Sequence, residues 1–406
     1  MRGGIYAGYA AKYPEEFEVA AIVDNDPEKL KLARARFGCP AYSDIRSFLA
    51  DGIAADIAAI CTQDAQHKEH AVRCMQAGYD LLLEKPIAAS PEDCLAIEAA
   101  AEKYERRVIV CHVLRYTPFY RKIKEIVSSG KLGKIMTLCA TENVGYYHQA
   151  HSFVRGPWRN SADSCPMILA KCCHDLDIIR WLVGEKCTEV SSFGSLGFFT
   201  LENAPAESAA YCSDCPVKDC VYNAQKIYEA HEWMANYFMS GDKTPESIAV
   251  HLRHTQYDRC VFRSDNDAVD HQVTAVKFEG GATAVHQMTA FSKEIYRDIK
   301  IHGTKAELYG VMEENFVELR PFGGETERID LTCESVYGNH GGGDAGLMRD
   351  VYLALNGRPT TGMSYLDVSM DSHKIAFAAE RSRTENKTIH LSLIHISEPT
   401  RRVVIS

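Results

Sequence analysis

The sequence predicts an α/β protein in which a doubly wound parallel sheet is followed by an α+β domain with a mostly antiparallel open sheet. Short apolar runs alternate with helical segments between residues 19 and 113, and this alternation is typical of right-handed βαβ units. Longer strand-like runs separated by glycine-containing turns follow residue 130, which favours antiparallel pairing. The length of 406 residues is enough for two domains.

The first part of the chain alternates between strands and helices. Apolar runs predict strands at 19–23, 57–61, 80–83 and 108–111. Helices are predicted at 27–37, 66–77, 90–104 and 119–129, with a further one capped by Ser43. Pro27 suits the first turn of its helix, and Gly38 suits the C-cap.

The second part has longer strands, predicted at 135–143, 269–278, 282–289 and 298–302, and two late helices, predicted at 345–355 and 366–382. We therefore expect a nucleotide-binding domain over residues 1–117 and an α+β domain for substrate binding and oligomerisation over residues 118–391. The second domain carries a cysteine-containing insertion at 201–260.

Both ends of the sequence depart from this pattern. A doubly wound sheet binds phosphate at a glycine-rich turn after its first strand. We expect that strand, with the opening glycines of a G-x-G-x-x-G turn, to lie upstream of Gly3, so that the first domain is truncated at its N-terminus. Residues 392–406 complete no element, and we interpret them as a non-native tail.

The composition narrows the classes of ligand. A net charge of −10 without a cluster of Lys and Arg argues against nucleic acid. The sequence contains neither an apolar run long enough to cross a bilayer nor a secretory signal at its start. The odd number of cysteines, 15, is typical of reduced thiols. We therefore expect a cytoplasmic protein that binds small molecules.

Two short motifs concentrate reactive side chains. Glu84-Lys85-Pro86 follows the predicted strand 80–83, and Lys171-Cys172-Cys173-His174-Asp175-Leu176-Asp177 opens an apolar helix that ends at Gly184. Strand ends and helix starts are where α/β enzymes place reactive groups. Lysines and a histidine beside a nucleotide site indicate hydride chemistry on a hydroxylated substrate.

The ordered set of motifs resembles the Gfo/Idh/MocA family of NAD(P)-dependent sugar and cyclitol oxidoreductases, from Arg2 to about Leu391. The matching pieces are Arg2-Gly3-Gly4, Asp24, Thr62 to His67, Glu84-Lys85-Pro86, Arg115-Tyr116, Trp158-Arg159 and His174-x-x-Asp177. One position departs from the family: where many members carry an aspartate four residues before the histidine, this chain has Ala170, followed by Lys171.

The resemblance implies an NAD site formed by Arg2, Gly3, Asp24, Thr62, His67, Glu84, Lys85, Arg115, Trp158 and Arg159. Asp24 favours NAD over NADP, because a carboxylate accepts hydrogen bonds from the ribose hydroxyls and repels a 2′-phosphate. The alternative is an aspartate that only forms the turn Asp24-Asn25-Asp26-Pro27.

Three residues are candidates for catalysis. Lys85 could stabilise alkoxide charge, or it could be a solvated surface lysine. Histidine titrates near neutrality, so His174 could exchange the hydroxyl proton with Asp177 orienting its ring, or it could be a helix cap. Lys171 could share the catalytic task, bind a substrate carboxylate or replace a structural group.

We expect hydride transfer between NAD and a ring hydroxyl carbon of a sugar, glycoside or cyclitol, with Tyr146, Tyr147, His148 and Arg155 available to bind the ring. One alternative is an NAD-dependent redox-assisted glycosidase, and the other is a non-catalytic ligand-binding protein on the same scaffold. We also expect a homo-oligomer, dimer or tetramer, formed through the C-terminal sheet.

The insertion holds a second cluster, Cys212-x-x-Cys215-x-x-x-x-Cys220. Three thiols so spaced could hold a structural Zn²⁺ ion with Cys260 or a histidine as the fourth ligand. Reduced packing cysteines or a disulfide are the alternatives. The adjacent pair Cys172 and Cys173 is predicted to pack in the core.

Overall fold

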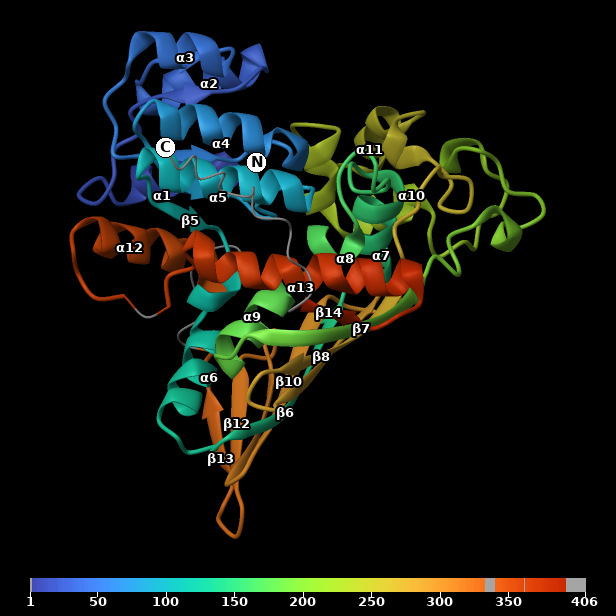
Figure 1. Ribbon diagram of the computed structural model, residues 1–406. Helices are drawn as coiled ribbons and strands as arrows, with labels where there is room; N and C mark the ends of the chain where they lie inside the picture. The colour runs from blue at the N-terminus through green and yellow to red at the C-terminus, as the bar shows by residue number, and fades with distance from the viewer. Residues whose placement is uncertain (1, 333–339, 361, 392–406) are drawn as a thin grey trace, which may run out of the picture. The chain divides into compact units, whose positions relative to one another are not determined.

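The computed structural model describes residues 2–332, 340–360 and 362–391 (Figure 1). The tail predicted at 392–406 lies outside these residues. The described residues form two compact units, the first within residues 2–130, 312–318 and 327–373 and the second within residues 131–311, 319–326 and 374–391.

The first unit contains the predicted alternation of strands and helices. Its strands are β1 (Ile22–Val23), β2 (Ala41–Tyr42), β3 (Ile57–Ile60), β4 (Asp80–Leu83) and β5 (Val108–Val110). Its helices are α1 (Arg2–Lys12), α2 (Pro27–Phe37), α3 (Ile45–Asp51), α4 (His67–Gln76), α5 (Pro91–Tyr104), α6 (Pro118–Ser128) and α12 (Gly343–Leu355).

Local signals explain where the helices begin and end. Gly38 ends α2 in the left-handed conformation, with a φ of 67°, as the sequence predicts for a C-cap. The cap of α3 was assigned wrongly to Ser43. Asp44 caps this helix, because its carboxylate accepts the N–H groups of Arg46 and Ser47 at 2.9 Å.

The strands β1 to β5 of the first unit pair in parallel. β1 pairs with β2, and β3, β4 and β5 form a separate three-stranded sheet. Helices α1 and α12 belong to one apolar cluster with the strands β4 and β5, through Tyr6, Leu82, Ile109, Leu347 and Val351. This packing explains why a late segment of the chain joins the N-terminal unit.

A mixed sheet has nine strands in the order β13-β12-β11-β10-β6-β9-β8-β7-β14, and its strands β6 to β11 and β14 belong to the second unit. The strands are β6 (Ile135–Asn143), β7 (Cys187–Ser195), β8 (His271–Phe278), β9 (Thr283–Thr289), β10 (Tyr296–Gly303), β11 (Ala306–Val311), β12 (Phe316–Pro321), β13 (Glu327–Asp330) and β14 (Ile389–His390). Burial alternates strictly along β8, so one face of the sheet is covered and the other is open.

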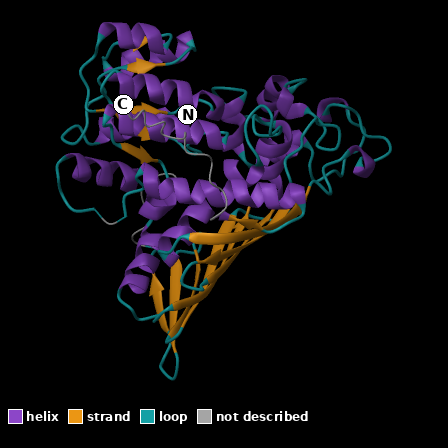
Figure 2. Ribbon diagram, in the orientation of Figure 1, coloured by secondary structure: helices purple, strands orange, loops and turns teal. Residues whose placement is uncertain are grey.

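Helix α9 (Cys173–Val183) packs on β6 and β9 of this sheet. The other helices of the second unit are α7 (Tyr146–His148), α8 (Met167–Ala170), α10 (Ala224–Ala230) and α11 (Pro245–Leu252). Helix α13 (Leu366–Glu385) belongs to the first unit as far as residue 373 and to the second from residue 374. Figure 2 shows the insertion around α10 and α11 as short helices joined by loops. Among the described residues, no helix is long and apolar enough to cross a membrane.

Candidate active site

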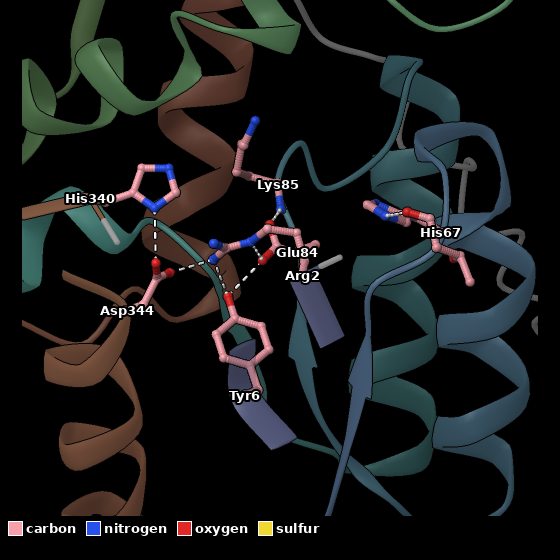
Figure 3. A network of polar contacts seen from close by, with 8 residues as sticks. Arg2, Tyr6, His67, Glu84, Lys85, His340 and Asp344 are labelled. Atoms are coloured by element: carbon pink, nitrogen blue, oxygen red, sulfur yellow. Dashed lines mark hydrogen bonds and ion pairs between the residues drawn. The ribbon is translucent and has the colours of Figure 1, made fainter. Parts of the chain in front are cut away.

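The loop after β4 is held by a buried carboxylate. Glu84 is only 4% exposed, and its Oε1 accepts hydrogen bonds from Arg2 Nε and from the Tyr6 hydroxyl, both at 2.6 Å. Arg2 Nη2 also donates to Asp344 Oδ1 at 2.6 Å, and His340 Nδ1 lies 3.0 Å from the other oxygen of Asp344 (Figure 3). Charge-assisted bonds of this kind fix the position of a loop.

The same loop is held from its other side by His67. This ring is completely buried, with Nδ1 2.8 Å from the Pro86 carbonyl oxygen and Nε2 3.1 Å from that of Thr62. His67 therefore ties the segment after β3 to the segment after β4. Figure 3 shows the Lys85 side chain extending away from the network of Arg2, Glu84 and Asp344.

Electrostatics favour the charged state of the Arg2–Asp344 pair. Burial by itself would raise the pKa of Asp344, but the hydrogen bonds from His340 and Arg2 outweigh burial and hold that pKa below its usual value. Burial would likewise lower the pKa of Arg2, and the charges of Glu84 and Asp344 raise it. Arg2 is thus a permanent cation that forms ion pairs with the two carboxylates Glu84 and Asp344.

The remaining candidates of the first unit differ in their surroundings. Asp24 follows β1, and its Oδ1 accepts the N–H of Asp26 at 3.0 Å, so the turn expected at this position exists, with the carboxylate still 33% exposed. Gly3 lies in the first turn of α1, where an added Cβ would come no closer than 3.7 Å to Cys61. Arg115 is 1% exposed.

In the second unit Lys171 belongs to a buried network of ion pairs. Lys171 Nζ lies 3.2 Å from Glu142 Oε1, and Glu142 forms a second ion pair with Arg297. Arg297 Nε in turn donates to Asp175 Oδ1 at 2.8 Å. Glu142 on β6 and Arg297 on β10 stand directly opposite each other in the antiparallel register, which is why the two side chains meet.

The network separates the pKa values of its two carboxylates. Burial would raise the pKa of Glu142, but the charges of Arg297 and Lys171 hold it below its usual value. Burial also acts on Asp175, and there it prevails, so the pKa of Asp175 is raised despite Arg297. Burial lowers the pKa of His286, whose Nε2 lies 3.9 Å from Asp175.

His174 lies in the first turn of α9 and is 5% exposed, while the fully buried Asp177 lies about one turn further along the same helix. Cys172 and Cys173 are both completely buried, in line with the packing role expected of them. The structure assigns Glu84 and Lys85 to the first compact unit and Lys171 and His174 to the second.

Other candidates in the second unit are engaged by protein groups. Arg159 Nε donates to Asp265 at 2.8 Å, and Trp158 packs near Phe153, with ring centroids 6.2 Å apart. Arg155 is completely buried and bonds to the carbonyl oxygen of Arg259. The expectation that Arg155 binds a substrate ring is therefore wrong, because its guanidinium is part of a core.

Sequence reasoning missed Asp344, Glu142, Arg297 and His286. Asp344 meets Arg2 across 342 positions of the chain, and Glu142 meets Arg297 only through strand register. No local sequence pattern predicts such partners. The one available signal was the presence of charged residues within predicted buried strands.

Two family profiles match the chain. The profile described as an oxidoreductase family with an NAD-binding Rossmann fold matches residues 3–112, and the profile of that family's C-terminal alpha/beta domain matches residues 124–391. The chain therefore belongs to the Gfo/Idh/MocA family of oxidoreductases. This finding confirms the predicted fold class and the class of enzyme, an NAD-dependent oxidoreductase.

Individual relatives share about a quarter to a third of their aligned residues with this chain. The protein YteT of Bacillus subtilis strain 168 is 27% identical over 369 residues, which cover 84% of this chain and 83% of YteT. Inositol 2-dehydrogenase 2 of Saccharopolyspora erythraea is 30% identical over 170 residues, which cover 41% of this chain and 47% of that enzyme.

Solved structures share the fold over nearly the whole chain. A levoglucosan dehydrogenase in complex with NADH and levoglucosan aligns with a TM-score of 0.70 at 18% identity, covering 95% of this chain and 96% of that one. The WlbA dehydrogenase of Bordetella pertussis, in complex with NADH and UDP-GlcNAcA, aligns with a TM-score of 0.64 at 17% identity, covering 96% and 95%.

Proposed function

We propose that this protein transfers a hydride between NAD and a ring hydroxyl carbon of a sugar, glycoside or cyclitol. The observation that carries the proposal is the doubly anchored loop of Lys85, which presents a cation at the carboxyl end of a parallel sheet. Ligands of doubly wound folds bind at this edge. Of the proteins named above, one is an inositol dehydrogenase and two are dehydrogenases in complex with levoglucosan or UDP-GlcNAcA, which supports a polyhydroxylated substrate.

The residues of the first unit fit a dinucleotide. α1 begins with Arg2-Gly3-Gly4 and has no acidic residue in its first turn, so its positive end suits a pyrophosphate. The carboxylate of Asp24 is partly exposed at the end of β1, where it suits ribose hydroxyls and disfavours a 2′-phosphate. NAD, when bound, supplies the hydride acceptor or donor. We propose Asp24 as the reason for a preference for NAD over NADP.

The charged groups have separate tasks in this proposal. Lys85 stabilises the negative charge that develops on the substrate oxygen as the hydroxyl loses its proton, and His174 takes that proton. Glu142 holds Lys171 in place through the ion pair at 3.2 Å, and Lys171 is the further cation proposed for catalysis. Thr62, Arg115, Trp158 and Arg159 complete the proposed cofactor surroundings, with His67 and Glu84 acting through the loop that they anchor.

The open face of the second unit's sheet supports the proposal of a homo-oligomer. Phe193 on β7 is 71% exposed and stands opposite Val273 on β8, which is 42% exposed. Val285 continues this apolar surface on β9. A second copy of the chain would cover these side chains, and light scattering coupled to size exclusion measures the resulting mass.

A substrate panel tests the proposed activity. Purified protein is incubated with NAD and a set of sugars, glycosides and cyclitols, and NADH absorbance is followed together with product. Net NADH formation with a ketone product is the expected result. Release of an aglycone without net NADH would instead indicate the redox-assisted glycosidase, and NAD binding without turnover on any member of a broad panel would indicate a ligand-binding protein.

A further inference from the structure

Four cysteines of the second unit line one small pocket. Cys212, Cys215 and Cys220 belong to the loop that begins with the single turn Cys212–Asp214, and Cys260 comes 40 residues after Cys220 in the sequence. The pocket encloses about 20 Å³, which is enough for one water molecule or an ion of similar size. The rest of its lining is mostly apolar and includes Pro205, Val217, Val261 and Phe262.

Backbone contacts hold the two cysteine-bearing segments side by side. Tyr211 and Arg259 form an antiparallel bridge, and the N–H of Cys260 donates to the carbonyl oxygen of Ala210 at 2.9 Å. The N–H of Cys215 donates to the carbonyl oxygen of Cys212 at 3.2 Å, so the Cys-x-x-Cys segment is a tight turn. The fold therefore gathers four thiols from segments that are far apart in the chain.

Arg155 gives an independent indication of negative charge at this pocket. Its side chain is completely buried, and its guanidinium donates to the carbonyl oxygens of Arg259 and Tyr222 at 2.7 Å. Nη2 also lies 3.5 Å from Cys212 Sγ, and Nη1 has no hydrogen-bond partner. Among the described residues no carboxylate pairs with this buried cation, and an unbalanced buried charge is costly.

We infer that Cys212, Cys215, Cys220 and Cys260 bind one zinc ion, with Arg155 balancing the charge of the thiolates. Four thiolates and Zn²⁺ leave a net charge of −2, and the guanidinium beside Cys212 offsets half of it. The loop spacing and the fourth ligand from a distant segment match structural zinc sites. The pocket suits a single ion, whereas an iron–sulfur cluster needs room for several atoms.

Zinc binding requires the sulfur atoms to draw together. Within the described part of the chain, the group of three ligand atoms that lie within 4.8 Å of one another is Cys172, Asp175 and His286, so the four thiols of the pocket are spaced more widely. That alternative group is a poor cation site, because Arg297 already pairs with Asp175. In the pocket, Zn–S bonds of about 2.3 Å would contract the loop of Cys212, Cys215 and Cys220.

The ion would stabilise a part of the protein that has little regular structure. The insertion's apolar core joins α10 and α11 to Tyr147 and Val154 of the preceding segment. A zinc site closes loops between distant positions and contributes folding free energy directly. Zinc binding should therefore raise the thermal stability of the second unit.

Metal analysis of the full-length protein tests the inference. Protein purified under reducing conditions without chelator should contain about one zinc per chain, and Cys212→Ser and Cys260→Ser should each lose it. Cys39→Ser, a half-buried cysteine of the first unit, is the matched control and should retain zinc. If the cysteine variants fold poorly, Co²⁺ is added to metal-free wild-type protein, and the absorption bands of a cobalt tetrathiolate should appear.

The role of Arg155 has a test of its own. Arg155→Met keeps the length of the side chain but removes its charge, so zinc should pass to a competing chelator at about 10- to 100-fold lower chelator concentration, as for other groups that support metal ligands. Protein that contains no zinc and takes up neither Zn²⁺ nor Co²⁺ overturns the inference. So does iron in place of zinc, a disulfide within the cluster, or zinc retained by both Cys212→Ser and Cys260→Ser.

Discussion

Replacing Glu142 by glutamine should destabilise the second unit far more than the same replacement at an exposed ion pair. Glu142 is completely buried between Arg297 and Lys171. At the 3.2 Å that separates it from Lys171, the gross attraction is about 5 kcal/mol for an effective dielectric constant near 20. Part of this is offset by burial of the charge, and breaking a buried pair typically costs about 3–5 kcal/mol.

We expect the lower end of that range, about 3 kcal/mol, because Arg297 retains Asp175 as a partner at 2.8 Å. Glu189→Gln is the matched control. Glu189 also stands opposite a cation across two strands of the same sheet, with Lys277 Nζ at 2.8 Å. That pair is exposed to solvent, so its loss should destabilise the protein much less than the loss of the buried Glu142 pair.

Tryptophan fluorescence during urea unfolding is the suitable assay. The chain has three tryptophans, Trp158, Trp181 and Trp233, and all three belong to the second unit. Their signal therefore reports the unit that contains Glu142, even if the two units unfold separately. Equal losses of unfolding free energy in Glu142→Gln and Glu189→Gln would refute the argument that burial gives the Glu142 pair its strength.

The stability that the Glu142 carboxylate contributes should depend on pH. Burial would raise the pKa of Glu142, but Arg297 and Lys171 hold it below its usual value. A carboxyl with a lowered pKa in the folded state contributes stability above its unfolded pKa, and this stability is lost as the pH falls through the folded value. The difference in unfolding free energy between wild type and Glu142→Gln should therefore shrink as the pH falls below about 4.

Three further variants test the proposed chemistry. Lys85→Ala should lower kcat by about 100- to 1,000-fold with an unchanged circular dichroism spectrum, and a near-normal kcat would remove Lys85 from catalysis. His174→Asn should lower kcat and flatten the acid limb of its pH profile; an unchanged limb would mean that another group takes the proton. Asp24→Ala should narrow the ratio of kcat/KM for NAD over NADP, and an unaltered ratio would leave Asp24 with only its turn-forming role.

Local physical chemistry accounts for what sequence reasoning predicted correctly. Pro27 and Gly38 mark the ends of α2 because backbone restrictions act on the residue itself. The strand 135–143 was predicted with the bounds that β6 has in the structure, because its composition and the turns beside it are local features. The order of the motifs along the chain was enough to identify the family, because comparing motif order does not require the distances between residues in the folded protein.

The sequence by itself thus determined the fold class, most helix and strand positions, the family and the positions of its motifs. Only the tertiary structure decided which charges meet. Arg2 finds Asp344 because α12 joins the N-terminal unit, and Glu142 finds Arg297 because β6 and β10 pair in one particular register. Likewise the four cysteines share a pocket because distant segments pair beside them. Such contacts depend on how whole helices and strands pack. The free energy of that packing comes from many residues along the chain, so no short segment predicts it.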